Sequence, residues 1–125
     1  KVSCFNFNLV TGDIENPIDI ISFPEDEGMP DGMTIDEEGM LWIAHWGGSK
    51  VSRWNPKTGE QIGSIEVPAL NVTSCTFGGK DLNELYITTA KSGLSEEQLK
   101  NYPLSGGLFR IKMDVKGSPS YSFKG

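Results

Sequence analysis

Two residues are best suited to chemistry. One is Asp31, in the tripeptide Pro30-Asp31-Gly32, and the other is His45, the single histidine of the chain. A carboxylate and an imidazole that meet at a strand end can bind a divalent metal ion or act as acid and base. Pro30 fixes the backbone before Asp31, and Gly32 lets another group approach closely. The alternative interpretation, an aspartate that caps its own turn beside an ordinary buried ring, stays open.

A hairpin is expected to bring Asp31 and His45 together. The run Asp36–Gly39 favours a turn, and the residues on either side of that turn are expected to pair with each other. Counting outward along the two strands places Asp31 opposite Ala44, one step from His45. The three acidic side chains of the turn are expected to be solvated at the hairpin tip.

Other catalytic motifs are absent from the sequence. It contains no Gly-x-Ser-x-Gly elbow, no Cys-x-x-Cys pair and no His-Glu-x-x-His helix. The pairs Gly47-Gly48 and Gly78-Gly79 have turn character and lack the strand-to-helix context of a phosphate loop.

The composition excludes some classes of partner. The 125 residues include 11 Lys and Arg against 17 Asp and Glu, so the net charge is −6. This balance argues against binding to nucleic acid or to an anionic membrane surface, because both need basic surfaces. The two cysteines, Cys4 and Cys75, lie in apolar stretches and indicate reduced core thiols in a cytoplasmic protein, with a disulfide as the open alternative.

An internal repeat indicates the architecture. Lys1–Asn6 returns as Lys50–Asn55, and Gly107–Lys112 is a weaker third copy. A second element, Thr34–Ala44, returns as Thr76–Thr88. The repeating unit is four strands joined by turns over about 40 to 50 residues, which is typical of a β-propeller blade.

The local pattern predicts many short strands and one helix. Ser95 and Gln98 form a predicted capping box, and Pro103 follows the end of that helix. The run Leu41–Trp46 is apolar nearly throughout, as a strand buried on both faces requires. The predicted strands are Val2–Asn8, Ile18–Phe23, Gly32–Asp36, Leu41–Trp46, Val51–Asn55, Ile62–Val67, Val72–Phe77, Leu85–Thr89, Leu108–Lys112 and Ser120–Phe123.

We therefore expect an all-β fold in which residues 1–125 supply about two and a half four-stranded blades. Such a piece leaves apolar sheet faces open, so either an N-terminal segment completes the propeller or copies of the chain assemble. We favour the first interpretation, in which the chain is the C-terminal portion of a single propeller domain and the N-terminal blades are its partner.

The sequence resembles the family of gluconolactonase, regucalcin (senescence marker protein) and luciferin-regenerating enzyme. The resemblance covers essentially the whole chain, and Ala44–Gly48 is most similar to the bacterial sugar lactonases of the group. The segments that carry it are Pro30–Ala44, Thr73–Gly79, Leu85–Thr88, Gly106–Phe109 and Val115–Gly117.

The resemblance implies a six-bladed propeller with one divalent cation, Ca, Zn, Mn or Mg, in its central channel. The family holds this cation with a glutamate near the N-terminus, a mid-chain asparagine and the aspartate that corresponds to Asp31. The first two would precede Lys1, so this chain alone would not build the site.

The implied activity is hydrolysis of a sugar lactone of the gluconolactone type to the aldonic acid. Asp31 would be a metal ligand and a catalytic general base, and His45 would contact substrate hydroxyls at the channel mouth. The alternatives are a non-catalytic calcium-binding or regulatory propeller, and a scaffold that has lost catalysis.

Overall fold

The computed structural model describes residues 1–122, and within them nine β-strands account for most of the regular structure. The all-β prediction is confirmed. The strands are β1 (Val2–Phe7), β2 (Ile14–Ile21), β3 (Met29–Ile35), β4 (Leu41–Trp46), β5 (Lys50–Asn55), β6 (Glu60–Glu66), β7 (Asn71–Gly78), β8 (Glu84–Ala90) and β9 (Leu108–Lys112); the helices are the 3₁₀ turn η1 (Glu25–Glu27) and α1 (Glu96–Asn101).

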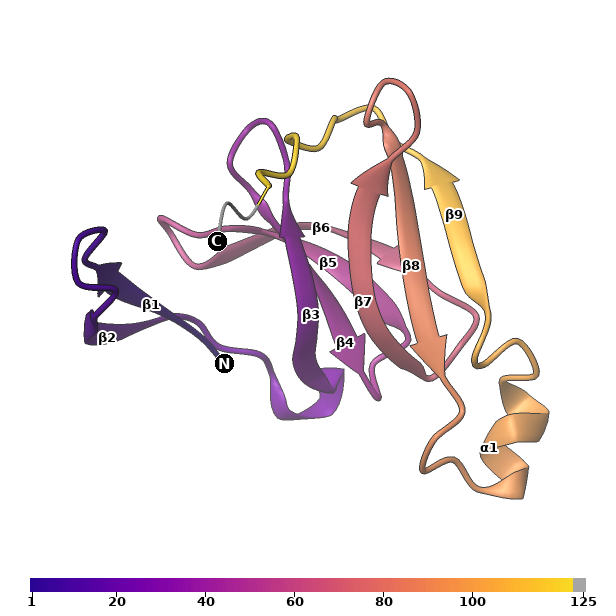
Figure 1. Cartoon of the computed structure of the whole chain (residues 1–125). Coiled ribbons are helices and arrows are strands. Elements are labelled where there is room, and N and C mark those ends of the chain that lie inside the picture. Colours follow the sequence, from indigo (N-terminus) through magenta and orange to yellow (C-terminus); the bar gives the residue numbers. More distant parts are fainter. Residues whose placement is uncertain (123–125) are drawn as a thin grey trace.

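The strands form three antiparallel sheets in sequence order. The sheets are β1-β2, β3-β4-β5-β6 and β7-β8-β9. Figure 1 shows the second and third sheets packed together, with β3 beside β7 and the hairpin β1-β2 off to one side. The repeat found in the sequence falls on equivalent strands, because Lys50–Asn55 and Leu108–Lys112 are each the third strand of their sheet.

Strand β4 is buried on both faces, as its apolar sequence predicted. Trp42 and Ala44 belong to the core shared with the third sheet, whereas Ile43 belongs to the core shared with the first. Successive side chains of a strand point to opposite faces, so a strand between two packed sheets needs apolar residues at every position.

Most predicted elements are confirmed. The bounds of β4 and β9 are those predicted, and the capping box of α1 is present, with Ser95 and Gln98 bonded reciprocally. The predicted strand Ser120–Phe123 is wrong for residues 120–122, which pair with no other strand of the described chain, and Phe123 lies outside the described residues. Within residues 1–122, no helix has both the length and the apolar character needed to cross a membrane.

The two cysteines differ in environment. Cys75 lies in the core as predicted, and its thiol donates to the carbonyl of Trp42 at 3.3 Å. Burial raises the pKa of the Cys75 thiol to about 12, so this group is unreactive at neutral pH. Cys4 is exposed in the structure, so the expectation of a core position was wrong for that residue.

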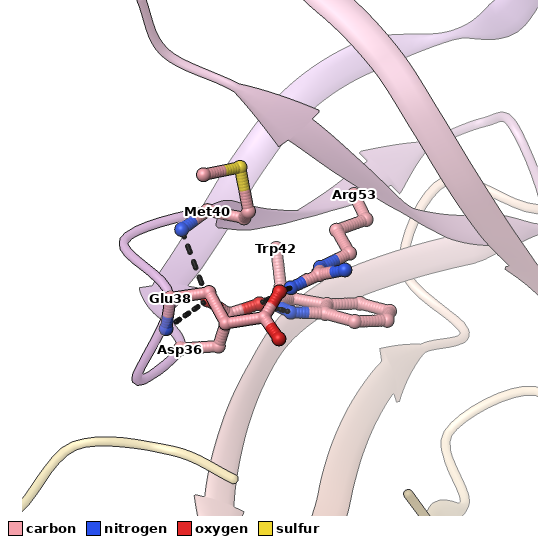
Figure 2. Close-up of polar contacts among 5 residues, drawn as sticks. All are labelled: Asp36, Glu38, Met40, Trp42 and Arg53. Carbon is pink, nitrogen blue, oxygen red and sulfur yellow. Dashed lines mark hydrogen bonds and ion pairs between the residues drawn. The ribbon is translucent and has the colours of Figure 1, made fainter. Parts of the chain in front are cut away.

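A buried carboxylate holds the β3-β4 hairpin. Asp36 is 1% exposed, and one of its oxygens accepts bonds from the backbone amides of Glu38 and Met40, both at 3.0 Å. The other oxygen accepts from the indole of Trp42 at 2.9 Å and from Arg53 Nε at 2.8 Å (Figure 2). The expectation that the whole acidic run is solvated was therefore wrong for Asp36.

Arg53 joins this carboxylate to the surface. Its guanidinium bridges Asp36 at 2.6 Å and the exposed Glu38 at 2.7 Å. Burial alone would lower the pKa of Arg53, but the bonds to Glu38 and Asp36 outweigh it and raise that pKa. The guanidinium stays charged, and the buried Asp36 carboxylate is fully bonded.

The same turn corrects the predicted register. Asp36 itself pairs with Met40 across the turn, so Ile35 pairs with Leu41 and the predicted pairing of Ile35 with Met40 was wrong by one residue. The loop thus has three residues and ends at Gly39, whose φ of 79° is the left-handed conformation such loops require.

We expect the Asp36→Asn variant to lose about 3 kcal/mol of unfolding free energy, because the amide cannot accept all the bonds that the buried carboxylate accepts from Trp42, Arg53 and the turn amides. Urea unfolding measures this loss. Glu38→Gln is the matched control, since it removes the exposed partner of the same arginine and should cost less than about 1 kcal/mol. Equal losses in the two variants would contradict the importance of the buried carboxylate.

Candidate functional site

Asp31 lies on an exposed edge of the second sheet. Strand β3 is the edge strand of that sheet, and it packs beside β7, the edge strand of the third sheet (Figure 1). The Asp31 side chain is exposed, and among residues 1–122 no hydrogen bond or ion pair engages its carboxylate. Its oxygens are therefore available to a cation or to water.

A β-bulge sets the position of Asp31. Pro30 pairs with His45 and Met33 pairs with Ile43, so Asp31 and Gly32 together face a single residue of β4. That residue is Ala44, so Asp31 lies opposite Ala44 as predicted but shares this position with Gly32, which was predicted to face Ile43. Bulges redirect side chains at sheet edges, and this one occurs at the candidate ligand.

Asp31 and His45 reach the same end of the hairpin, as predicted, but they lie on opposite faces. Cross-strand partners share a face, so His45 lies on the face of Pro30, whereas Asp31 is the next residue along β3. Asp31 is exposed, whereas His45 is 0% exposed. The structure thus places the two groups near each other without directing them to one point.

The ring of His45 is engaged at both nitrogens. Nδ1 lies 2.8 Å from the carbonyl oxygen of Glu27, and Nε2 lies 2.5 Å from Ser52 Oγ. Burial lowers the pKa of His45, so the neutral imidazole is the form that the fold favours. A contact of His45 with substrate stays a prediction. It would require the ring to break its hydrogen bonds with both Glu27 and Ser52.

Gly32, the residue after the candidate ligand Asp31, allows the third sheet to approach β3 closely. A Cβ atom at Gly32 would lie 2.6 Å from Ser74 Cβ and 2.8 Å from the carbonyl oxygen of Thr73, closer than real contacts allow. The hydroxyl of Thr73 lies 2.7 Å from that of Thr88 on β8. Thr73 and Ser74 therefore lie against Gly32, the residue after Asp31, a proximity that was not predicted because it depends on how two sheets pack.

The residues present offer one cation ligand rather than a set. Among residues 1–122, no group of three or more His, Cys, Asp or Glu side chains is close enough to hold a metal ion. Ions such as Ca²⁺ take six to eight oxygen ligands, so Asp31 fits such an ion as one ligand among several. The remaining ligands would be other oxygen groups or water.

Comparison with solved structures defines the class of protein. The chain superposes on the calcium-binding protein regucalcin from Agrobacterium tumefaciens with a TM-score of 0.82 and 29% identity, covering 93% of this chain and 39% of that one. The prediction of a partial β-propeller is confirmed, since the three sheets correspond to only part of such a protein.

Comparison of sequences gives the family. Residues 1–91 match the family described as "SMP-30/Gluconolactonase/LRE-like region". Rabbit (Oryctolagus cuniculus) regucalcin is 43% identical over 126 residues, which covers 100% of this chain and 42% of that protein. A Bacillus subtilis protein named "Putative sugar lactone lactonase YvrE" is also 43% identical, over 97% of this chain and 41% of its own length. The chain belongs to this family, and it spans about 42% of the length of its regucalcin relative.

We expect Gly32→Ala to destabilise the fold by about 1–3 kcal/mol, because the new methyl group would push β3 away from β7. Chemical unfolding measures the loss. Gly63→Ala is the matched control: it lies in strand β6, where the nearest atom to an added Cβ is 3.8 Å away, and it should change stability little. Similar losses at both positions would contradict the close approach of the two sheets.

Proposed function

We propose that this chain is the C-terminal portion of a metal-dependent lactonase that hydrolyses a sugar lactone of the gluconolactone type to the aldonic acid. The observation that carries the proposal is Asp31: an exposed carboxylate, unengaged by the described residues, at a bulge where two blades meet. Family membership and the relative named as a sugar lactone lactonase support the same reaction class.

In this proposal Asp31 binds one divalent cation. Once bound, that cation would polarise the lactone carbonyl and lower the pKa of a bound water. The Asp31 carboxylate can also accept a proton from the attacking water. These two roles compete for the same oxygens, so each oxygen is expected to serve one of them. The glutamate and asparagine expected from the family resemblance would complete the ligand set.

The open surfaces of the chain support a partner that completes the propeller. The hairpin β1-β2 exposes several large apolar side chains, and such side chains gathered together mark a contact surface. On β3, apolar side chains close to Asp31 in sequence are exposed as well. These side chains are Phe5, Phe7, Ile14 and Ile18 on the hairpin and Met29, Met33 and Ile35 on β3. We propose that N-terminal blades of the same protein cover them and bring the remaining ligands to Asp31.

A second candidate function is a calcium-binding or regulatory propeller without turnover. It is favoured by the calcium-binding regucalcin on which the chain superposes and by the regucalcin relatives. Both candidates use Asp31 as a cation ligand. Turnover of a lactone therefore separates them, and cation binding does not.

The test measures gluconolactone hydrolysis by the whole protein that contains this chain, with added manganese, zinc or calcium. We expect metal-dependent turnover that falls by more than about 100-fold in Asp31→Ala, because even residues that only support a metal ligand cost about 10–100-fold when changed. The matched control is Asp114→Ala, another exposed aspartate, which should retain activity.

The absence of turnover with every metal, for gluconolactone and a panel of sugar lactones, would reject the lactonase proposal. Cation binding that is lost in Asp31→Ala would then favour the regulatory propeller. Turnover that survives in Asp31→Ala would remove Asp31 from the site.

A further inference from the structure

The segment that leads into Asp31, residues 24–30, is short and irregular. It contains the single turn η1, passes through Gly28 and enters β3 two residues before Asp31. Its own backbone supplies little support, since η1 has no side-chain cap. Contacts with β4 and β5 must therefore fix the approach of the chain to Asp31.

A relay of hydrogen bonds from β5 through β4 holds residues 24–30 in place. The carbonyl oxygen of Glu27 can only accept, so Nδ1 of His45 carries the proton that it receives. The indole of Trp54 can only donate, so Ser52 accepts from Trp54 and directs its own proton to Nε2 of His45. The relay thus runs from Trp54 through Ser52 and His45 to Glu27, and it sets one tautomer of the ring.

Packing and charge reinforce the contact at Glu27. A Cβ atom at Gly48 would overlap the carbonyl oxygen of Glu27 and lie 2.8 Å from His45 Cβ, so only glycine allows this approach. The Glu27 carboxylate pairs with Lys50 at 2.9 Å. Phe23, just before the segment, stacks on the His45 ring with centroids 4.2 Å apart. His45 therefore contacts both the start and the middle of the approach to Asp31.

We propose that His45 is a positioning residue for the site at Asp31: its Nδ1–H bond to the Glu27 carbonyl clamps residues 24–30 and fixes where β3 begins. The inference rests on the proposed cation-binding function of Asp31. His45 acts through the backbone of the segment and touches neither cation nor substrate, which accounts for its complete burial at the same hairpin end as an exposed ligand.

The electrostatic surroundings are consistent with this role. Burial lowers the pKa of His45, and the positive charge of Lys50 acts in the same direction. The carbonyl of Glu27 and the carboxylates of Glu27 and Glu66 oppose the shift without cancelling it. The ring therefore stays neutral, with one donor and one acceptor, which is the form that the relay needs.

Two variants of similar size separate the clamp from simple core packing. His45→Asn places its amide near the position of Nδ1 and can still donate to Glu27, whereas His45→Gln reaches the position of Nε2 and keeps only the contact with Ser52. Both lose the stacking on Phe23. The matched control is Ser52→Ala, which breaks the relay on the side away from the segment and leaves the Glu27 contact in place.

The experiment uses the whole protein and two readouts, hydrogen exchange of peptides spanning residues 24–31 and calorimetric affinity for calcium or manganese. We expect His45→Gln to expose the segment to exchange and to weaken cation binding about tenfold, as loss of groups that support a metal ligand does. His45→Asn and Ser52→Ala should retain both the protection and the affinity, even where they lower thermal stability.

Equal losses in His45→Asn and His45→Gln, or an equal loss of affinity in Ser52→Ala, would overturn the proposal, since packing rather than the Glu27 bond would then be responsible. Faster exchange with unchanged affinity would overturn the link to Asp31. If the unaltered protein binds neither cation, the proposed function fails and the link to Asp31 with it, while the exchange comparison still decides whether the Glu27 bond clamps the segment.

Discussion

The Asp36 carboxylate is the constraint on which the candidate site depends. It accepts bonds from the turn that follows it, from Trp42 on β4 and from Arg53 on β5, so one buried group joins three strands. The amide of Glu37 then donates to the carbonyl of Lys116, which ties the same turn to the chain beyond β9. A slip of one residue in a hairpin exchanges its two faces. The Asp36 network thus fixes the register from the turn as far as Met33, where the bulge that contains Asp31 begins.

The two ends of the hairpin serve different purposes. At the turn, Asp36 fixes the register, and at the other end the bulge at Asp31 and Gly32 interrupts it. The interruption can persist because both sides of it are held: Gly32 lies against Ser74 of the next sheet, and the chain before Asp31 lies on the His45 relay. The backbone on both sides of Asp31 is therefore held by contacts with other strands.

Local sequence signals predicted the elements well and their pairing less well. The apolar run of β4 and the capping box of α1 depend only on neighbouring residues, so both were predicted with correct positions. The predicted register of the hairpin was wrong at the turn because the register depends on the burial of Asp36. That burial in turn requires Arg53, which is 17 residues away. Asp31 could be identified from its motif, but the proximity of Ser74 and the burial of His45 arise from contacts between elements distant in sequence.

The geometry also explains why a single blade cannot supply a complete cation site of the proposed kind. Each sheet contributes one edge strand to the surface where β3 meets β7, and a strand directs only alternate side chains to a given face. One blade can therefore place one or two oxygen ligands at a point beyond its edge. A cation that needs six or more has to recruit them from several edge strands and from water. In the proposed site the ligands are consequently far apart in sequence, and the precision of each depends on contacts such as the Asp36 network and the His45 relay within its own blade.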